Sequence, residues 1–387
     1  MPIVKPVAVR PDHIAPDATN DATNLDMLRA IAVLCVFFAH LVLCLVDTGH
    51  YQMAGYPFWR LQLTELGHVG VLLFFVHTAL VLMLSLERMP GRKLVLSFYI
   101  RRVFRIYPLS IICVGAVLFF QVPQVPDGKF LPWGTGEIVS NFLLVQNIFQ
   151  KQNIIAPLWT LPREFQMYLV LPFIYFLLKR FSSSIVVLLL WVAAFAAVPV
   201  APLLGSFPCF MGGVFAYQLG KERTFKLPGA TWPAAVIILL SLHAVSMLSP
   251  YADFDRSDFV FCMFLGAVIP NINNLQTSAV TAICRTIAKY SYGIYLCHDP
   301  ALWFAFVKLG SLPIAVQWMT LIALMVGLPV AGYHLIEAPM IGVGRRIAAT
   351  WGARRTAGNP SADASKQPRP VREDLSRRPA HYGSSSR

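Results

Sequence analysis

The sequence has few charged residues: Asp, Glu, Lys and Arg make up 13% of its 387 residues, about half of the share that is usual in soluble domains. Hydrophobic residues make up 56%, and they recur in long runs along the chain. Such runs argue against a soluble protein with one large core, and they lack the alternation typical of a transmembrane barrel. We therefore expect an all-α fold, a polytopic transmembrane helical bundle.

Other features that mark common protein classes are also absent. The seven cysteines are scattered, mostly within apolar runs, and their spacings indicate neither a disulfide framework nor a metal site, so no metal is expected. No small-residue cleavage site follows the first apolar run, so we expect that run to stay as a span. No internal repeat is obvious, which weakens the alternative of a secondary transporter or exporter of a glycan or small solute.

The net charge of +13 does not indicate a nucleic-acid-binding protein. Residues 343–387 hold ten Arg or Lys and three Asp or Glu, which together supply +7 of the +13. The segment is rich in Pro, Ser, Arg and Ala and lacks apolar periodicity, so residues 347–387 are expected to form a disordered basic cytoplasmic tail. Beside a membrane span, such a tail fixes topology and contacts membrane lipid. A catalytically silent scaffold that uses the tail to bind a partner is a further alternative.

Ten apolar segments predict about ten membrane-spanning helices. They cover residues 25–46, 66–86, 97–121, 158–178, 184–199, 201–219, 231–249, 257–271, 289–308 and 313–334. Lys and Arg are concentrated in alternate loops, which places both termini in the cytoplasm. The amphipathic stretch 135–150 is too short to cross and is expected to be re-entrant or interfacial. The domains are then an N-terminal arm (1–23), a membrane domain (24–346) and the tail.

The first span carries two ionisable residues on one face. In "NLDMLRAIAVLCVFFAH", residues 24–40, Arg29 and His40 are eleven positions apart. A helix turns about 100° and rises about 1.5 Å per residue, so the two lie roughly 16 Å apart along the axis and share a face. Each residue alone has a structural explanation, a snorkelling arginine or a histidine bonded within the bundle. Because ionisable groups at depth are expensive, the shared face indicates a functional pair.

A cluster of arginines opens the third span, in "SFYIRRVFRIYPLS", residues 97–110. Arg101 and Arg105 are four positions apart, and Arg102 and Arg105 are three apart, so the guanidinium groups lie on one side of a helix. Such clusters bind phosphates through paired donors. The alternative is that they only orient the span in the membrane.

Two further stretches hold candidate polar residues. In "APLWTLPREFQMYLVLPF", residues 156–173, Glu164 and Tyr168 point in the same direction, although Glu164 also suits a simple helix cap. In "YSYGIYLCHDP", residues 290–300, Tyr292, Tyr295 and His298 recur along one side, as a functional stripe or as packing. Near the end of the last span, Glu337 is expected to pair with an inner arginine.

In order and position, these stretches resemble the motifs of the acyltransferase-3 family of integral membrane proteins. The resemblance covers residues 24 to about 346 and rests on "LDMLRAIAVLCVFFAH", "YIRRVFRIYP", "WTLPREFQMYL", "SYGIYLCH" and "EAP". The second span departs from the family pattern. Leu72 stands at the position of the family's usual acid, and Thr78–Ala79 replaces the usual Ser-Gly pair. His77 is an additional departure, and it either packs within the bundle or lines the path of the acceptor.

The resemblance implies an O-acyltransferase that moves an acyl group, usually acetyl, from cytoplasmic acetyl-CoA to a hydroxyl of an envelope glycan or a lipid-linked sugar. It implies a multi-pass protein of the bacterial inner membrane, with Arg29 and the arginines of the third span as the binding residues for the donor phosphates. His40 would be the catalytic base, since burial favours the neutral ring, or it would carry the acyl group covalently. Glu164 would orient the acceptor or fix the tautomer of His40. The substrate-binding residues would be Tyr168, Tyr292, Tyr295 and His298. The oligomeric state and the acceptor stay open.

Overall fold

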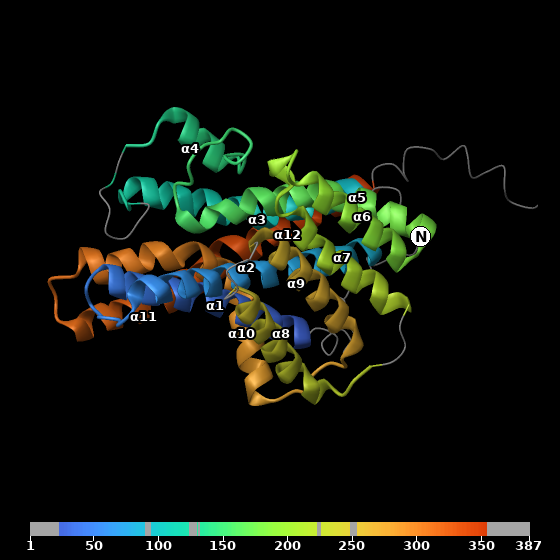
Figure 1. Ribbon diagram of the computed structural model, residues 1–387. Coiled ribbons are helices and arrows are strands. Elements are labelled where there is room, and N and C mark those ends of the chain that lie inside the picture. The colour runs from blue at the N-terminus through green and yellow to red at the C-terminus, as the bar shows by residue number, and fades with distance from the viewer. Residues whose placement is uncertain are drawn as a thin grey trace, which may run out of the picture.

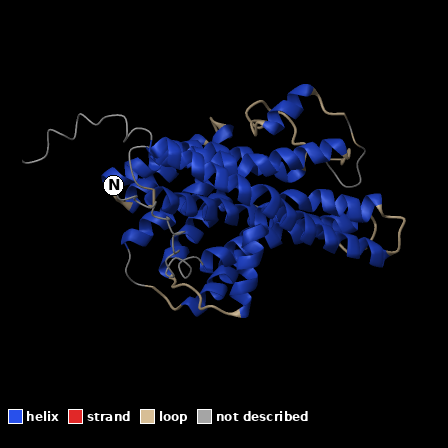
Figure 2. Cartoon of the chain, turned by 180° about the vertical axis from the view of Figure 1, so that it is seen from behind, coloured by secondary structure: helices blue, strands red, loops and turns tan. Residues whose placement is uncertain are grey.

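The computed structural model describes residues 23–89, 94–123, 130, 132–222, 226–247 and 254–353, and expectations for residues outside these ranges stay predictions. The regular secondary structure of the described residues is helical, apart from one isolated bridge between Leu227 and Ile272, and loops connect the helices (Figure 2). The main helices are α1 (Thr23–Asp47), α2 (Tyr56–Glu87), α3 (Leu94–Phe119), α4 (Thr135–Phe142), α5 (Thr160–Phe181), α6 (Ser184–Ala197), α7 (Phe207–Glu222), α8 (Trp232–Met247), α9 (Phe254–Val268), α10 (Ala279–Leu302), α11 (Ile314–Gly332) and α12 (Ala338–Ala353). The expected all-α fold is confirmed.

Each of the ten predicted segments coincides with a helix, but only five helical segments of the described chain are both long and apolar enough to cross a membrane. These are Thr23–Asp47, Trp59–Glu87, Leu94–Phe119, Gly229–Ser246 and Ile314–Thr350. Helices α5 and α10 carry several charged side chains, which lower their mean hydropathy. The expectation of ten spans with both termini in the cytoplasm therefore stays a prediction.

Two helix boundaries differ from the expectation. The stretch 135–150 is helical only in α4, which lies beside one end of α3 and apart from the main bundle (Figure 1). Helix α11 continues through a π-helical segment, η7 (Tyr333–Glu337), into α12, and this continuous helix ends at Ala353. Helix α12 thus continues past residue 346, where the membrane domain was expected to end, and its Ala348 is buried. The domain boundaries themselves stay predictions.

Helix α1 lies between α2 and α10, and this sandwich forms the centre of the bundle (Figure 1). The side chain of Asn24 holds the start of α1 against the segment before α10. It donates to the carbonyl of Asn273 at 2.9 Å and accepts from the backbone N–H of Leu275 at 2.9 Å. The residues of α1 that face its neighbours, such as Leu28 and Ala32, are fully buried. Any side chain on this inner face of α1 is therefore held between two other helices.

Glycines bring α2, α7 and α9 into close backbone contact. A Cβ at Gly266 of α9 would lie 2.0 Å from the carbonyl oxygen of Gly212 in α7. A Cβ at Gly213 of α7 would lie 2.2 Å from the carbonyl oxygen of Val76 in α2. Small residues allow helices to approach this closely in membrane proteins. No larger side chain fits these two positions without moving a helix.

We predict that Gly266→Ala destabilises the bundle by about 1–3 kcal/mol, because the added methyl group over-packs a backbone contact. The matched control is Gly327→Ala in α11, where an added Cβ meets no atom within 4 Å. That control is expected to leave stability unchanged or to raise it by up to about 1 kcal/mol, because Ala favours helix over Gly. Unfolding of the purified protein in detergent measures both, and equal unfolding midpoints would contradict the close contact.

Candidate active site

A cavity of about 510 Å³ lies within the bundle and is walled by α1, α2, α3, α5 and α10. Its size falls in the range of roughly 300–1,000 Å³ that is typical of small-molecule sites. One end is charged, and the other is lined by hydroxyl and aromatic side chains. The residues that the argument uses are Arg29 of α1; Phe74 and His77 of α2; Arg101, Arg102 and Arg105 of α3; Thr160, Glu164 and Tyr168 of α5; and Tyr292 and Tyr295 of α10.

The charged end brings the arginine of α1 together with the arginine cluster of α3. The Nε atoms of Arg29, Arg101 and Arg102 are buried and have no hydrogen-bond partner among the described residues. Arg102 also donates from Nη2 to the Ser85 hydroxyl at 3.4 Å and stacks over the Phe98 ring. Buried donors without partners are costly, so these guanidinium groups fit a ligand that brings anionic oxygens.

Carboxylates partly balance this charge. Glu164 accepts a short hydrogen bond from the Tyr168 hydroxyl and interacts electrostatically with Arg29, Arg102 and Arg105. Glu337 is 2% exposed, and its carboxylate lies 3.9 Å from Nη2 of Arg105. The expected pairing of Glu337 with an inner arginine is confirmed.

The opposite end of the cavity is closed by hydrogen-bonded hydroxyl groups. The Tyr295 hydroxyl donates to the carbonyl of Pro157 at 2.8 Å and lies 2.9 Å from the hydroxyl of Thr160. The Tyr292 hydroxyl donates to the carbonyl of Ile106 at 2.8 Å. With their hydrogens directed at backbone carbonyls, both tyrosines shape the cavity wall by their rings and their oxygen atoms.

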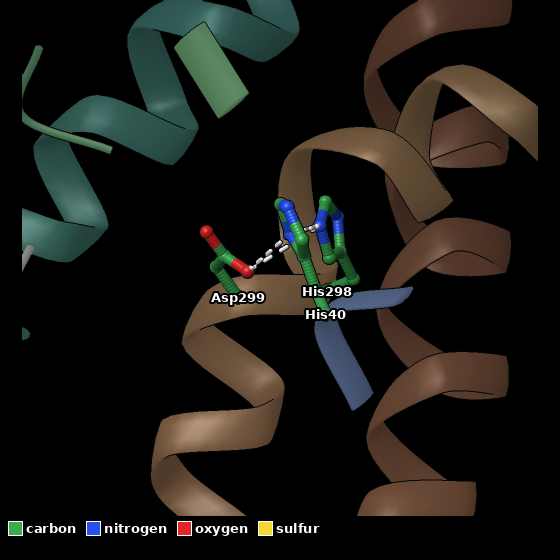
Figure 3. A group of neighbouring side chains, drawn as sticks. All are labelled: His40, His298 and Asp299. Atoms are coloured by element: carbon green, nitrogen blue, oxygen red, sulfur yellow. Dashed lines mark hydrogen bonds and ion pairs between the residues drawn. The ribbon is translucent and has the colours of Figure 1, made fainter. Parts of the chain in front are cut away.

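A histidine pair and an aspartate form a second group of polar side chains. Nδ1 of His40 lies 2.8 Å from Nε2 of His298 and 3.0 Å from Oδ1 of Asp299 (Figure 3). His298 is fully buried, whereas the side chains of His40 and Asp299 are 31% and 19% exposed. Figure 3 shows that His298 and Asp299 come from one helix, α10, and that His40 reaches them from α1.

The local sequence of α10 explains how this pair is held. Pro300 lies inside the helix and has no N–H for the carbonyl of Leu296. The thiol of Cys113 in α3 donates to that carbonyl instead, at 3.3 Å. His298 lies two residues before this proline, and its Nδ1 is 2.8 Å from the carbonyl oxygen of Tyr295. The first bond joins the last turns of α10 to α3, and the second holds the His298 ring against its own helix.

The histidine group lies one helical turn beyond the closed end of the cavity. On α10 the cavity lining ends at Tyr295, three residues before His298. On α2 the lining begins at Val71, four residues after Gly67, which packs against His40. One turn rises about 5.4 Å. His40 itself is not among the lining residues, and the Tyr295 ring, 6.0 Å from that of His298, separates the two groups.

The structure thus places the candidates from the sequence in two neighbouring groups, with the Tyr295 ring between them. Arg29, Arg101, Arg102, Arg105, Glu164, Tyr168, Tyr292 and Tyr295 line the cavity, and His40 and His298 form the histidine pair. Glu164 lies at the arginine end, and the hydrogen-bond partners of His40 are His298 and Asp299. Sequence reasoning missed Asp299, although an acid inside the apolar run "LCHDP" was a signal for it. His77 lines the cavity and is 7% exposed.

A second histidine–aspartate group lies between α2 and the helices α8 and α9. Nε2 of His68 lies 2.6 Å from Oδ2 of Asp258, and Nε2 of His243 lies 3.5 Å from Oδ1 of the same carboxylate. His243 and Asp258 are nearly fully buried, and the His68 ring stacks on Trp159 at 6.1 Å. The group ties α2 to α8 and α9, and no sequence motif pointed to it.

Comparison with known proteins agrees with this picture. The profile of a family described as an acyltransferase domain matches residues 23–334. Acyltransferase MdmB of Streptomyces mycarofaciens is 26% identical over 336 residues, which cover 77% of this chain and 83% of that protein. An O-acetyl transferase of the Shigella phage Sf6 is 21% identical over 297 residues, which cover 71% and 83%. No solved structure matches the chain. The chain belongs to the acyltransferase-3 family of membrane-associated proteins and is an acyltransferase.

Proposed function

We propose that the protein is a multi-pass O-acyltransferase of the bacterial inner membrane that moves an acetyl group from cytoplasmic acetyl-CoA to a hydroxyl of an envelope glycan. Exopolysaccharide, O-antigen and lipid-linked sugar are the candidate acceptors. The relative from phage Sf6 is named an O-acetyl transferase, which supports acetyl as the group and oxygen as the acceptor atom.

One observation carries the proposal: a cavity with five arginines at one end has its other end one helical turn from His40. Acetyl-CoA is an elongated donor with phosphates at one end and its thioester at the other. Guanidinium groups bind phosphates through paired charge-assisted hydrogen bonds. The donor then lies along α1, with Arg29 and the arginines of α3 at its phosphates and His40 beyond its reactive end.

The side from which the donor enters follows from the charges around the cavity. Arg88, Arg101, Arg102 and Arg105 lie at the end of the bundle where the loops are rich in Lys and Arg. By the positive-inside rule, this end faces the cytoplasm, where acetyl-CoA is made. The acceptor is expected from the opposite side, where His40 is about one third exposed (31%).

The chemistry assigned to His40 is general base catalysis. His40 takes the proton of the acceptor hydroxyl while that oxygen bonds to the thioester carbon. The carbon–sulfur bond then breaks, and the thiolate that leaves takes the proton from His40, so charge and protons balance. A positioned base of this kind contributes about 10²–10⁴-fold to the rate.

The closed end of the cavity favours a short acyl group. The Tyr295–Thr160 pair and the Phe74 ring, 5.8 Å from the Tyr295 ring, form the wall between the cavity and the histidine pair. A thioester has to pass this wall to reach His40, and an acetyl group needs the smallest displacement of these side chains.

We expect His40→Ala to lower acetyl transfer by about 10²–10⁴-fold while CoA binding is unchanged, because the base is lost and the arginines remain. Release of CoA thiol from acetyl-CoA in membranes supplied with deacetylated envelope glycan measures transfer, and calorimetry with CoA measures binding. His50→Ala is the control, since His50 bonds to Thr48 outside the site. Transfer that survives in His40→Ala would show that another group is the base.

Combined Arg102→Ala and Arg105→Ala should raise the KM for acetyl-CoA by about 10²–10⁴-fold, because two charge-assisted hydrogen bonds of about 1.5–3 kcal/mol each are lost. The KM for the glycan should change little. The control is Arg180→Ala, an exposed arginine at the end of α5 that stacks on Phe181. An equal rise in both KM values would contradict a phosphate-binding role.

Deletion of the gene should remove an acetyl group from one envelope glycan. Mass spectrometry of each glycan fraction, with and without the gene, would show the loss as a missing acetyl mass. A strain that carries the His40→Ala protein is the control, and it should match the deletion strain. Unchanged acetylation in all fractions, with the thiol-release assay also negative, would refute the proposed function.

A further inference from the structure

The position of the proton on His298 follows from its surroundings. Nδ1 of His298 lies 2.8 Å from the backbone carbonyl oxygen of Tyr295, and a carbonyl oxygen only accepts hydrogen bonds. Nδ1 therefore carries the proton. The ring is fully buried, which favours its neutral form. In the neutral ring, Nε2 of His298 then holds a lone pair and accepts a hydrogen bond.

The same reasoning fixes the proton of His40. Its Nδ1 faces two acceptors, Nε2 of His298 at 2.8 Å and the carboxylate oxygen Oδ1 of Asp299 at 3.0 Å. The two acceptors lie 3.4 Å from each other, so the single N–H of Nδ1 faces both of them and Nδ1 must be the donor. The remaining nitrogen, Nε2, makes no hydrogen bond with the described residues and keeps its lone pair.

We propose that His298 and Asp299 are positioning residues that hold the proton of His40 on Nδ1, so that Nε2 is the base and the acceptor hydroxyl reaches it beside Gly67 of α2. The inference deepens the proposed function and rests on it. Neither residue contacts a reacting atom in this scheme. Both act through the tautomer and the orientation of the His40 ring, as partners of catalytic and metal-binding histidines commonly do.

Gly67 of α2 lies on the side of the His40 ring to which Nε2 points. A Cβ built at Gly67 would lie 4.0 Å from both Nε2 and Cδ2 of His40, and 3.3 Å from the Cβ of Ala39. The missing side chain therefore leaves space along the Cδ2–Nε2 edge of the ring. A methyl group at this position would narrow the approach of a hydroxyl to Nε2 and would leave Nδ1 untouched.

Asp299 also balances the charge that forms during the reaction. When Nε2 takes the hydroxyl proton, the ring becomes an imidazolium, and its positive charge lies beside the Asp299 carboxylate. When Nε2 returns the proton to the departing thiolate, the ring is neutral again with its proton still on Nδ1. Asp299 and His298 gain and lose no proton in the cycle.

The direct test is ¹⁵N NMR of the detergent-purified protein labelled at histidine, with the His40 signals assigned by subtraction of the His40→Gln spectrum. We expect a protonated Nδ1 and an unprotonated Nε2. A His40 ring protonated at Nε2 and not at Nδ1 would overturn the proposal. A metal ion bound at Nδ1 would also overturn it, because His40, His298 and Asp299 offer ligand atoms within 4.8 Å of one another. Metal analysis before and after chelation detects that outcome.

Kinetics test the consequence. Asp299→Ala should lower kcat by about 10–100-fold, the usual effect of losing a histidine's orienting partner, with the KM for acetyl-CoA unchanged. Asp299→Glu should restore part of kcat. The control is Asp47→Ala, at the outer end of α1, where Asp47 pairs with Arg60. Equal kcat values for the wild type and Asp299→Ala would contradict the positioning role.

Gly67→Ala tests the direction of approach. We expect about a tenfold rise in the KM for the glycan, the discrimination that one extra carbon commonly produces, with the ¹⁵N signals of His40 unchanged. Gly115→Ala in α3, whose added Cβ meets nothing within 4 Å, is the control. An unchanged KM would place the acceptor elsewhere. If His40→Ala abolishes transfer while Nε2 proves protonated, only this inference fails and the proposed function stands.

Discussion

The cost of holding charge inside a membrane protein dominates this structure. An arginine, a histidine or a carboxylate at depth must turn inward and find a partner or a polar cavity. Four arginines of α1 and α3 do so at one place, around a cavity that holds only a few carboxylates. The positive excess that remains is costly to keep without a ligand. It is the physical reason to regard this end of the cavity as an anion site rather than as a topological signal alone.

Helix α1 connects the two halves of the site because it lies between α2 and α10. Its inner face carries Arg29 at the cavity and His40 one turn past the cavity's other end. Helix α2 is held from both sides, by Gly67 against His40 and by His68 bonded to Asp258 of α9. A rigid α2 keeps the space beside Nε2 constant. The position of Nε2 of His40, which we propose as the base, thus depends on packing and on ion pairs that belong to four different helices.

The sequence predicted the helices well, because apolar runs and their periodicity report burial directly. It also brought Arg29 and His40 onto one face, since that needs only the geometry of one helix. It also put Glu164 and Tyr168 on the same side of one helix, where the two side chains hydrogen-bond. It could not show that Glu164 lies beside the arginines of α1 and α3 rather than beside His40. Contacts between helices depend on packing angles that periodicity does not contain. Asp299 was missed for the same reason, because its role appears only when α1 lies beside α10.

The departures in the second span fit the charge balance of the cavity. Leu72 stands where the family has an acid, and it is 1% exposed in the apolar core. His77, one helical turn and a half further, lines the cavity and interacts electrostatically with Arg29 and Arg105. The imidazole of His77 adds a hydrogen-bonding group to the cavity wall beside these two guanidinium groups. Glu164 and Glu337 interact electrostatically with Arg29 and Arg105, and Asp26 interacts with Arg29, so these three carboxylates supply negative charge at the arginine end of the cavity.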